Sequence, residues 1–433
     1  MKKLFLVIIS CLSLVFLMPV NIIHAQNQHD SDQFVSKQEH EKLKQEMEEL
    51  KAQMKMLLKN QSQSPPAPVI TTPTTTVSQP VASQELKSLK REVRSLQAQT
   101  DSQKPGSTGF LITGYGFAGF TDPEGSDSSF NAGFNPIFLW RLNDNLFFEG
   151  ELEVELEDTS TKVALEYGQV SYLVNDYVTV GAGKFLNPSN YFMERLHPLW
   201  INKLPDKPMS MSGNNRIQAS TQLGVQVRGG FPMGQTRGEY AFYASNGPDM
   251  ANDGSQRFKN FTDTNNNKAV GGRVGWLPFP GFGLGYGFEV STVNDLDGSS
   301  LDAVTHAADI NYLRTSQYLL GNIDLRGQFA HREVDRSSSP LLPFNNTSSG
   351  GYAQFAYRPI LSSIHIIRRF EPVFRYDWID LQNNVAFNDR QRWTTGLNYY
   401  LADRTILKFA YRFDDTENAR NSDALLFQIA TGF

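Results

Sequence analysis

The sequence predicts an all-β protein: a transmembrane antiparallel β-barrel of about 16 strands, with an N-terminal α-helical coiled-coil segment before it. Polarity alternates from residue to residue in many short segments after Gly109, and this pattern continues to Phe433. Short and long connections alternate between these segments. Aromatic residues make up 12% of the 433 residues, and glycine occurs 33 times. This composition suits strands that face lipid on one side and water on the other.

Residues 1–25 are predicted to be a signal peptide. Lys2 and Lys3 precede an apolar run, and a plausible cleavage site follows at Ala25. The only cysteine, Cys11, resembles a lipidation site, but the apolar stretch before it is short. Cleavage at Ala25 leaves a mature chain without cysteine, and therefore without disulfides or thiolate ligands. A helical membrane protein is excluded, because no mature segment reaches the ~20 consecutive apolar residues of a spanning helix.

Residues 26–60 predict a periplasmic coiled coil, because apolar residues recur at alternating steps of four and three. The seam consists of Leu43, Met47, Leu50, Met54 and Leu57. Residues 61–83 contain five prolines and predict an extended linker. A second, shorter coiled coil in residues 84–104 has the seam Leu86, Leu89, Val93 and Leu96. The apolar stripe favours self-association, and docking of one helix elsewhere on the same chain is the alternative.

Residues 105–433 form the predicted barrel, and Leu146–Glu157 is its clearest strand. Its acidic residues share one face and its apolar residues the other, because successive side chains of a strand point in opposite directions. The acidic face needs water, whereas the apolar face can meet lipid. The same alternation occurs in Thr221–Phe231, Leu319–Arg332, Arg392–Leu401 and Ile406–Phe413. Closure is expected, because an open sheet would leave unpaired backbone groups in lipid.

The connections of the predicted barrel alternate in length. Short turns are expected at Asn143–Asn145, Asn175–Asp176, Pro278–Gly281 and Ala402–Arg404. Longer polar stretches occur near 121–131, 186–215, 246–267, 292–302, 333–349, 378–389 and 414–422. Membrane barrels have short periplasmic turns and longer outer loops, so both barrel ends are expected in the periplasm. The segments 232–240 and 358–370 leave the strand count open by about two.

The signal peptide, the alternating strands and the C-terminal Phe433 together resemble Gram-negative outer-membrane porins. The barrel is similar to the phosphate-selective porin superfamily, and most similar to its trimeric members with an N-terminal coiled coil. Five short motifs carry this resemblance: Gly183-Lys184-Phe185, Arg195-Leu196-His197-Pro198, Ile201-Asn202-Lys203-Leu204-Pro205, Asn246-Gly247-Pro248 and Gly272-Arg273-Val274-Gly275. The resemblance implies an outer-membrane location, a homotrimer, and Phe433 as an assembly signal.

The longest predicted connection, 186–215, is too apolar for a fully solvated loop and is expected to fold into the lumen. A barrel of about 16 strands otherwise encloses a wide aqueous channel, so selection needs a constriction. The candidate constriction residues are charged or titratable side chains of this stretch: Glu194, Arg195, His197, Lys203 and Asp206. The resemblance implies the same inward loop. An extracellular lid or a contact between protomers is the alternative.

Two rows of charge are expected on the inner wall. The acidic row, on the third strand, is Glu149, Glu151, Glu153 and Glu155. The basic row, on late strands, is Arg326, Arg332, Arg375, Arg392, Lys408 and Arg412. Opposed rows of charge would produce a transverse field, and rings of charge tune ion selectivity in channels. The alternative is that these charges only solvate a wet lumen and pair with one another.

The lead functional hypothesis is passive diffusion of small hydrophilic, charged solutes through an outer-membrane porin. The alternative is a structural anchor that tethers the outer membrane to peptidoglycan through the coiled coil, and an outer-membrane hydrolase is a third possibility. The dispersed histidines show no metal-ligand spacing, and the sequence shows no Ser–His pairing and no phosphate-cradling glycine loop. Asp263, Asn265 and Asn267 have the opening spacing of a calcium loop, but Lys268 replaces its glycine and no Glu stands at its twelfth position, so a solvated outer loop is favoured. We therefore expect no catalytic residue, metal site or cofactor, and the modest net charge of −5 gives no sign of a nucleic-acid partner. The solute and the sign of its charge stay open.

Overall fold

The computed structural model describes residues 109–433, apart from 158, 214–215, 251–255, 259–260, 262, 264, 343–345, 383–388 and 418–420. The predicted signal peptide, linker and both coiled-coil segments lie outside the described residues. No helix within the described residues is long and apolar enough to cross a membrane.

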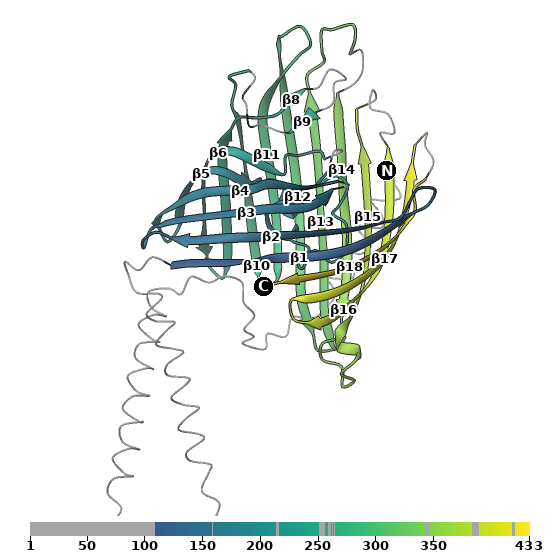
Figure 1. Ribbon diagram of the computed structural model, residues 1–433. Helices are drawn as coiled ribbons and strands as arrows, with labels where there is room; N and C mark the ends of the chain where they lie inside the picture. The colour runs from purple at the N-terminus through teal and green to yellow at the C-terminus, as the bar shows by residue number, and fades with distance from the viewer. Residues whose placement is uncertain are drawn as a thin grey trace, which may run out of the picture. The chain divides into compact units, whose positions relative to one another are not determined.

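Sixteen antiparallel strands close into one barrel (Figure 1), which confirms the predicted barrel and its strand count. The strands of the first half are β1 (Gly109–Pro123), β2 (Ser129–Arg141), β3 (Leu146–Glu157), β4 (Ser160–Asn175), β5 (Val178–Leu186), β6 (Thr221–Met233), β7 (Thr236–Ser245) and β10 (Ala269–Phe279). Those of the second half are β11 (Phe282–Asn294), β12 (Ser300–Ser316), β13 (Gly321–Val334), β14 (Thr347–Arg358), β15 (Phe370–Asp380), β16 (Arg390–Ala402), β17 (Thr405–Thr416) and β18 (Ala424–Gly432).

The two rims of the barrel differ in the length of their connections. The four short turns expected from the sequence and both ends of the barrel share one rim, and the longest connections are on the other. Residues 232–240 contain a tight turn at Gly234, whose φ of 65° favours glycine. Residues 358–370 contain the β14–β15 connection, with a 3₁₀ turn, η2 (Ile367–Arg369). The β7–β10 connection carries a small separate sheet of β8 (Asp249–Met250) and β9 (Gln256–Arg257).

Side-chain polarity alternates across the wall as the sequence predicts. On β17, Phe409 and Phe413 face outward and are about half exposed, whereas Lys408, which precedes Phe409 and points the opposite way, is fully buried inside. The outward face can therefore meet lipid, and the inward face collects the polar and charged groups.

The last residue closes the seam between β1 and β18. The Phe433 backbone N–H donates to the Gly114 carbonyl oxygen at 3.0 Å, and the Phe433 ring stacks on Phe134 with centroids 5.5 Å apart. Gly114 has a φ of 147°, and a Cβ there would lie 2.2 Å from the Asn135 carbonyl oxygen. Glycine is thus required where the two strands and β2 meet.

Candidate functional site

The connection between β5 and β6 comprises residues 187–220, and we call it the inner loop. Its described residues, 187–213 and 216–220, lie inside the barrel. Its side chains and backbone contact inward-facing residues on β3, β6 and β13, and on every strand from β15 to β18. These strands are distributed around most of the circumference. The structure therefore places all five charged or titratable candidates of the inner loop in the lumen.

Apolar packing explains why this segment folds inward. Its apolar side chains form a cluster with apolar residues of β12 to β15. The loop contributes Phe192, Met193, Leu196, Met209, Met211 and Ile217, and Phe192 lies in a single π-helical turn, η1 (Phe192–Leu196). Glycines of the wall make room for the loop: a Cβ at Gly350 would lie 2.8 Å from Ser210, and one at Gly396 would lie 2.7 Å from Leu204.

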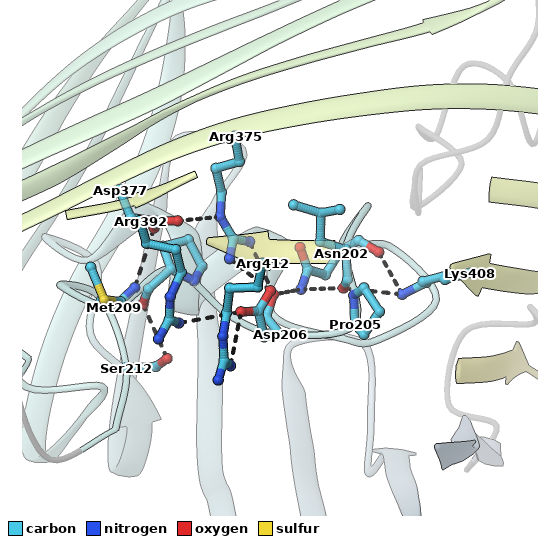
Figure 2. A network of polar contacts seen from close by, with 12 residues as sticks. Asn202, Pro205, Asp206, Met209, Ser212, Arg375, Asp377, Arg392, Lys408 and Arg412 are labelled. Carbon is cyan, nitrogen blue, oxygen red and sulfur yellow. Dashed lines mark hydrogen bonds and ion pairs between the residues drawn. The ribbon is translucent and has the colours of Figure 1, made fainter. Parts of the chain in front are cut away.

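Asp206 is the centre of the strongest contact between the inner loop and the wall. Its carboxylate lies 2.8 Å from Arg375 Nη2, 3.3 Å from Arg392 Nη1 and 3.8 Å from Arg412 Nη1. Figure 2 shows the three arginines converging on this one carboxylate, and we call the four residues the Asp206 clamp. Burial raises the pKa of Asp206, but the three guanidinium groups outweigh burial and hold it below its ordinary value.

The clamp arginines have further carboxylate partners on the wall. Arg375 Nε lies 2.7 Å from Asp377, and both Arg392 and Arg412 contact Asp414, at 2.5 Å and 3.0 Å. Arg375 is 0% exposed. All three arginines are therefore paired with carboxylates, and Arg375 and Arg392 are buried, so they are not bare wall charges.

Two lysines fix the preceding part of the inner loop. Lys203 Nζ lies 2.7 Å from Glu371 Oε1 on β15. Burial lowers the pKa of Lys203, but the Glu371 carboxylate more than compensates and raises it above its ordinary value. Lys408 on β17 donates to the backbone carbonyls of Leu199, Asn202 and Leu204. A buried cation that binds loop carbonyls holds the backbone itself rather than one side chain.

The structure differs from the expected acidic row at Glu151. This residue is 1% exposed, accepts a hydrogen bond from Tyr115 Oη at 2.9 Å, and lies 3.8 Å from His197 Nε2 of the loop. It is therefore a contact point for the loop and not a wall charge open to water. Glu149, two residues earlier on the same face, accepts a hydrogen bond from Gln169 and lines a cavity.

The remaining residues of both rows share the inward face but not one environment. Glu153 and Glu155 are partly exposed. Arg326 lies 2.7 Å from Asp324, and Arg332 lies 3.6 Å from Glu289. Most residues of the basic row are thus paired with carboxylates of the wall, which agrees with the alternative that these charges pair with one another.

A second charged network lies on the opposite side of the inner loop from the clamp. Glu194 contacts both its neighbour Arg195, at 3.1 Å, and Arg228 on β6, at 2.8 Å. Burial raises the pKa of Glu194, but Arg228 and Arg195 outweigh it, so the pKa lies below its ordinary value. Arg195 also lies 3.2 Å from Glu239 on β7, which contacts Arg273 on β10.

Two cavities border this second network. The larger is about 330 Å³ and the smaller about 210 Å³, and both are lined by Glu194, Arg195 and Arg228. Glu239 and Arg273 line the larger one, and Glu149 the smaller one. Open space with charged walls therefore lies between the inner loop and strands β3 to β10.

Sequence reasoning missed several of these wall partners. Arg228, Glu239, Arg273 and Glu371 were not among the candidates, although each lies on an inward face in an alternating segment. Strand parity could have identified them as inward-facing. Only the path of the inner loop determines which of the inward-facing residues contact the loop or line the cavities. Within the described residues, no group of three or more His, Cys, Asp or Glu could hold a metal ion.

No family model matches the chain, and no curated protein is similar to it. Similar solved structures include an anion-selective porin from Comamonas acidovorans, with 12% identity, a TM-score of 0.51, and coverage of 76% of this chain and 100% of that one. OprB from Pseudomonas putida has 10% identity and a TM-score of 0.51, with coverage of 78% and 96%. The outer-membrane channel DcaP of Acinetobacter baumannii has 11% identity and a TM-score of 0.50, with coverage of 76% and 99%.

At these identities the likeness shows the fold alone, that of outer-membrane porins and channels. The phosphate-selective superfamily in particular is not confirmed.

Proposed function

We propose that this protein is a bacterial outer-membrane porin, in which small hydrophilic solutes diffuse passively through a barrel narrowed by the inner loop. One observation carries the proposal: the inner loop crosses the lumen, is held on the far wall by the Asp206 clamp, and borders charged cavities on the near side. A closed barrel with a polar interior and an apolar exterior is the arrangement expected of a channel through lipid.

The solute path follows the side of the lumen that the clamp does not occupy. Arg195 and Arg228 each keep 36% of their side-chain surface exposed there, whereas Arg375 and Lys408 are fully buried. Size selection comes from the inner loop, and charge selection comes from the groups that stay accessible to water.

The location and assembly of the protein form part of the same proposal. The rim with the short turns faces the periplasm, the chain is exported by its signal peptide, and Phe433 acts as the assembly signal. The coiled-coil segments support a homotrimer and are the part that could reach peptidoglycan. Such a tether and diffusion through the barrel are compatible functions.

Single-channel recording of the purified full-length protein in planar bilayers tests the proposal. We expect discrete, ohmic conductance steps whose size follows the salt concentration. A protein that inserts with β-sheet spectra and gives no steps would overturn the porin function, and empty detergent micelles are the control.

A further inference from the structure

The two cavities beside the inner loop combine groups of opposite charge around one space. Both are lined by Glu194, Arg195 and Arg228, so they share a wall. The smaller cavity adds Glu149 and Tyr167 from strands β3 and β4. None of the four residues of the Asp206 clamp lines either cavity.

We propose that this pair of cavities is a recognition site for zwitterionic solutes, such as amino acids or short peptides, on their way through the barrel. Arg195 and Arg228 bind the carboxylate of the solute, and Glu149 binds its ammonium group. This inference rests on the proposed function, because the solute must enter the lumen to reach the site.

The two arginines are available to a second anion. Among the described residues, Arg228 contacts a carboxylate only through Nη2, and Arg195 through Nε and Nη1. Each is 36% exposed, while their shared partner Glu194 is only 6% exposed. Guanidinium groups have five N–H donors in a planar fork that matches a carboxylate, so the free donors can bind one.

Glu149 supplies the opposite charge without being neutralised. Its carboxylate accepts one hydrogen bond, from Gln169 Nε2 at 2.5 Å, and no cation of the described residues pairs with it. Glu239, in contrast, lies 3.2 Å from Arg195 and 2.5 Å from Arg273. Glu149 is therefore the carboxylate of the two cavities that lacks a cationic partner among the described residues, and Tyr167 lines the same smaller cavity.

A solute with both charges fits this arrangement better than a simple ion. A plain anion at Arg228 would leave the Glu149 carboxylate as an unfavourable neighbour, and a plain cation would meet two guanidinium groups. A zwitterion places each charge beside its opposite in a space of limited volume. Net-neutral polyols of equal size gain neither contact.

Liposome swelling with the full-length protein tests the inference. The probes are glutamine, a zwitterion, and xylitol, a neutral polyol of similar size, and the readout is the ratio of their entry rates. The variants are R228Q, R195Q and E149Q. The matched control is R237Q, an exposed arginine at the β6–β7 turn that lines neither cavity.

We expect the wild-type ratio to exceed one, and each of the three variants to lower it roughly two- to fivefold, as partly exposed ion contacts allow. The R237Q ratio should equal that of the wild type. Xylitol entry reports in every sample that the barrel is folded and open, so a low ratio cannot come from misfolding.

Two outcomes would overturn the inference. One is a glutamine-to-xylitol ratio unchanged in all three variants. The other is a glutamine-to-xylitol ratio that does not exceed one with the wild-type protein; a reversal potential that shifts in the variants would then make these residues a simple ion filter. Failure of the porin proposal is distinct, because neither xylitol nor ions would then enter with the wild-type protein.

Discussion

The inner wall of the barrel has two regions in which the same types of charged residue have different roles. On β15 to β17, charged side chains such as Arg375, Arg392 and Lys408 contact the inner loop, as in the Asp206 clamp. On β3 to β10, Glu149, Arg228, Glu239 and Arg273 border open cavities, and Arg228 keeps about a third of its side-chain surface exposed. Equal alternation in sequence thus produces an anchoring wall and an accessible wall, and coverage by the inner loop makes the difference.

Removing the central anion of the anchoring wall should give the largest effect. In D206N three guanidinium groups lose their shared partner, and breaking a buried ion pair costs about 3–5 kcal/mol. We expect the inner loop to leave the wall, single-channel conductance to rise several-fold, and proteases to cleave within residues 187–220. The control D403N removes an exposed carboxylate from the β16–β17 turn, and conductance like that of wild type in D206N would contradict the role of the clamp.

The second contact of the anchoring wall should couple two residues far apart in sequence. Lys203 and Glu371 are 2.7 Å apart, so a double-mutant cycle of K203M and E371Q should give a coupling free energy of about 1–3 kcal/mol. Urea unfolding of the barrel, followed by tryptophan fluorescence, measures it. Additive effects of the two substitutions would show that the contact does not hold the loop.

Acid should weaken the anchoring wall at a pH set by Asp206. Its pKa in the folded protein lies below the ordinary 3.8, so its stabilising contribution is complete above that value and is lost as the pH falls through the folded pKa. We therefore expect constant conductance from pH 7 down to about 4, and larger conductance steps in stronger acid. A rise in conductance already near pH 6 would show that a group other than Asp206 controls the position of the inner loop.

The smallest effects should separate two neighbouring glutamates. E149Q, on the accessible wall, should change the cation-to-anion permeability ratio on the order of twofold in favour of anions, as expected for one water-exposed charge. E151Q should leave this ratio unchanged and lower the free energy of unfolding by about 1 kcal/mol, because Glu151 contacts Tyr115 and the loop. Reversal potentials in salt gradients provide the first readout, and equal shifts in both variants would show that coverage by the inner loop does not separate the two glutamates.

The sequence alone determined the barrel. Two-residue alternation assigned Lys408 and Arg412 to the inside and Phe409 to the outside, because the pleat of a strand sends successive side chains to opposite faces. Closure followed from the cost of unpaired backbone groups in lipid. Both are local rules that need no knowledge of distant residues, so they could be read from short segments.

Only the tertiary structure decided which inward charges are available. Asp206 and Arg375 are separated by 169 positions, and no local pattern states that they meet. Parity gives Glu149 and Glu151 the same face, yet the inner loop buries one and leaves the other beside a cavity. The path of one loop across the lumen depends on packing against many strands at once, so the accessible residues emerge only when the barrel is closed around it.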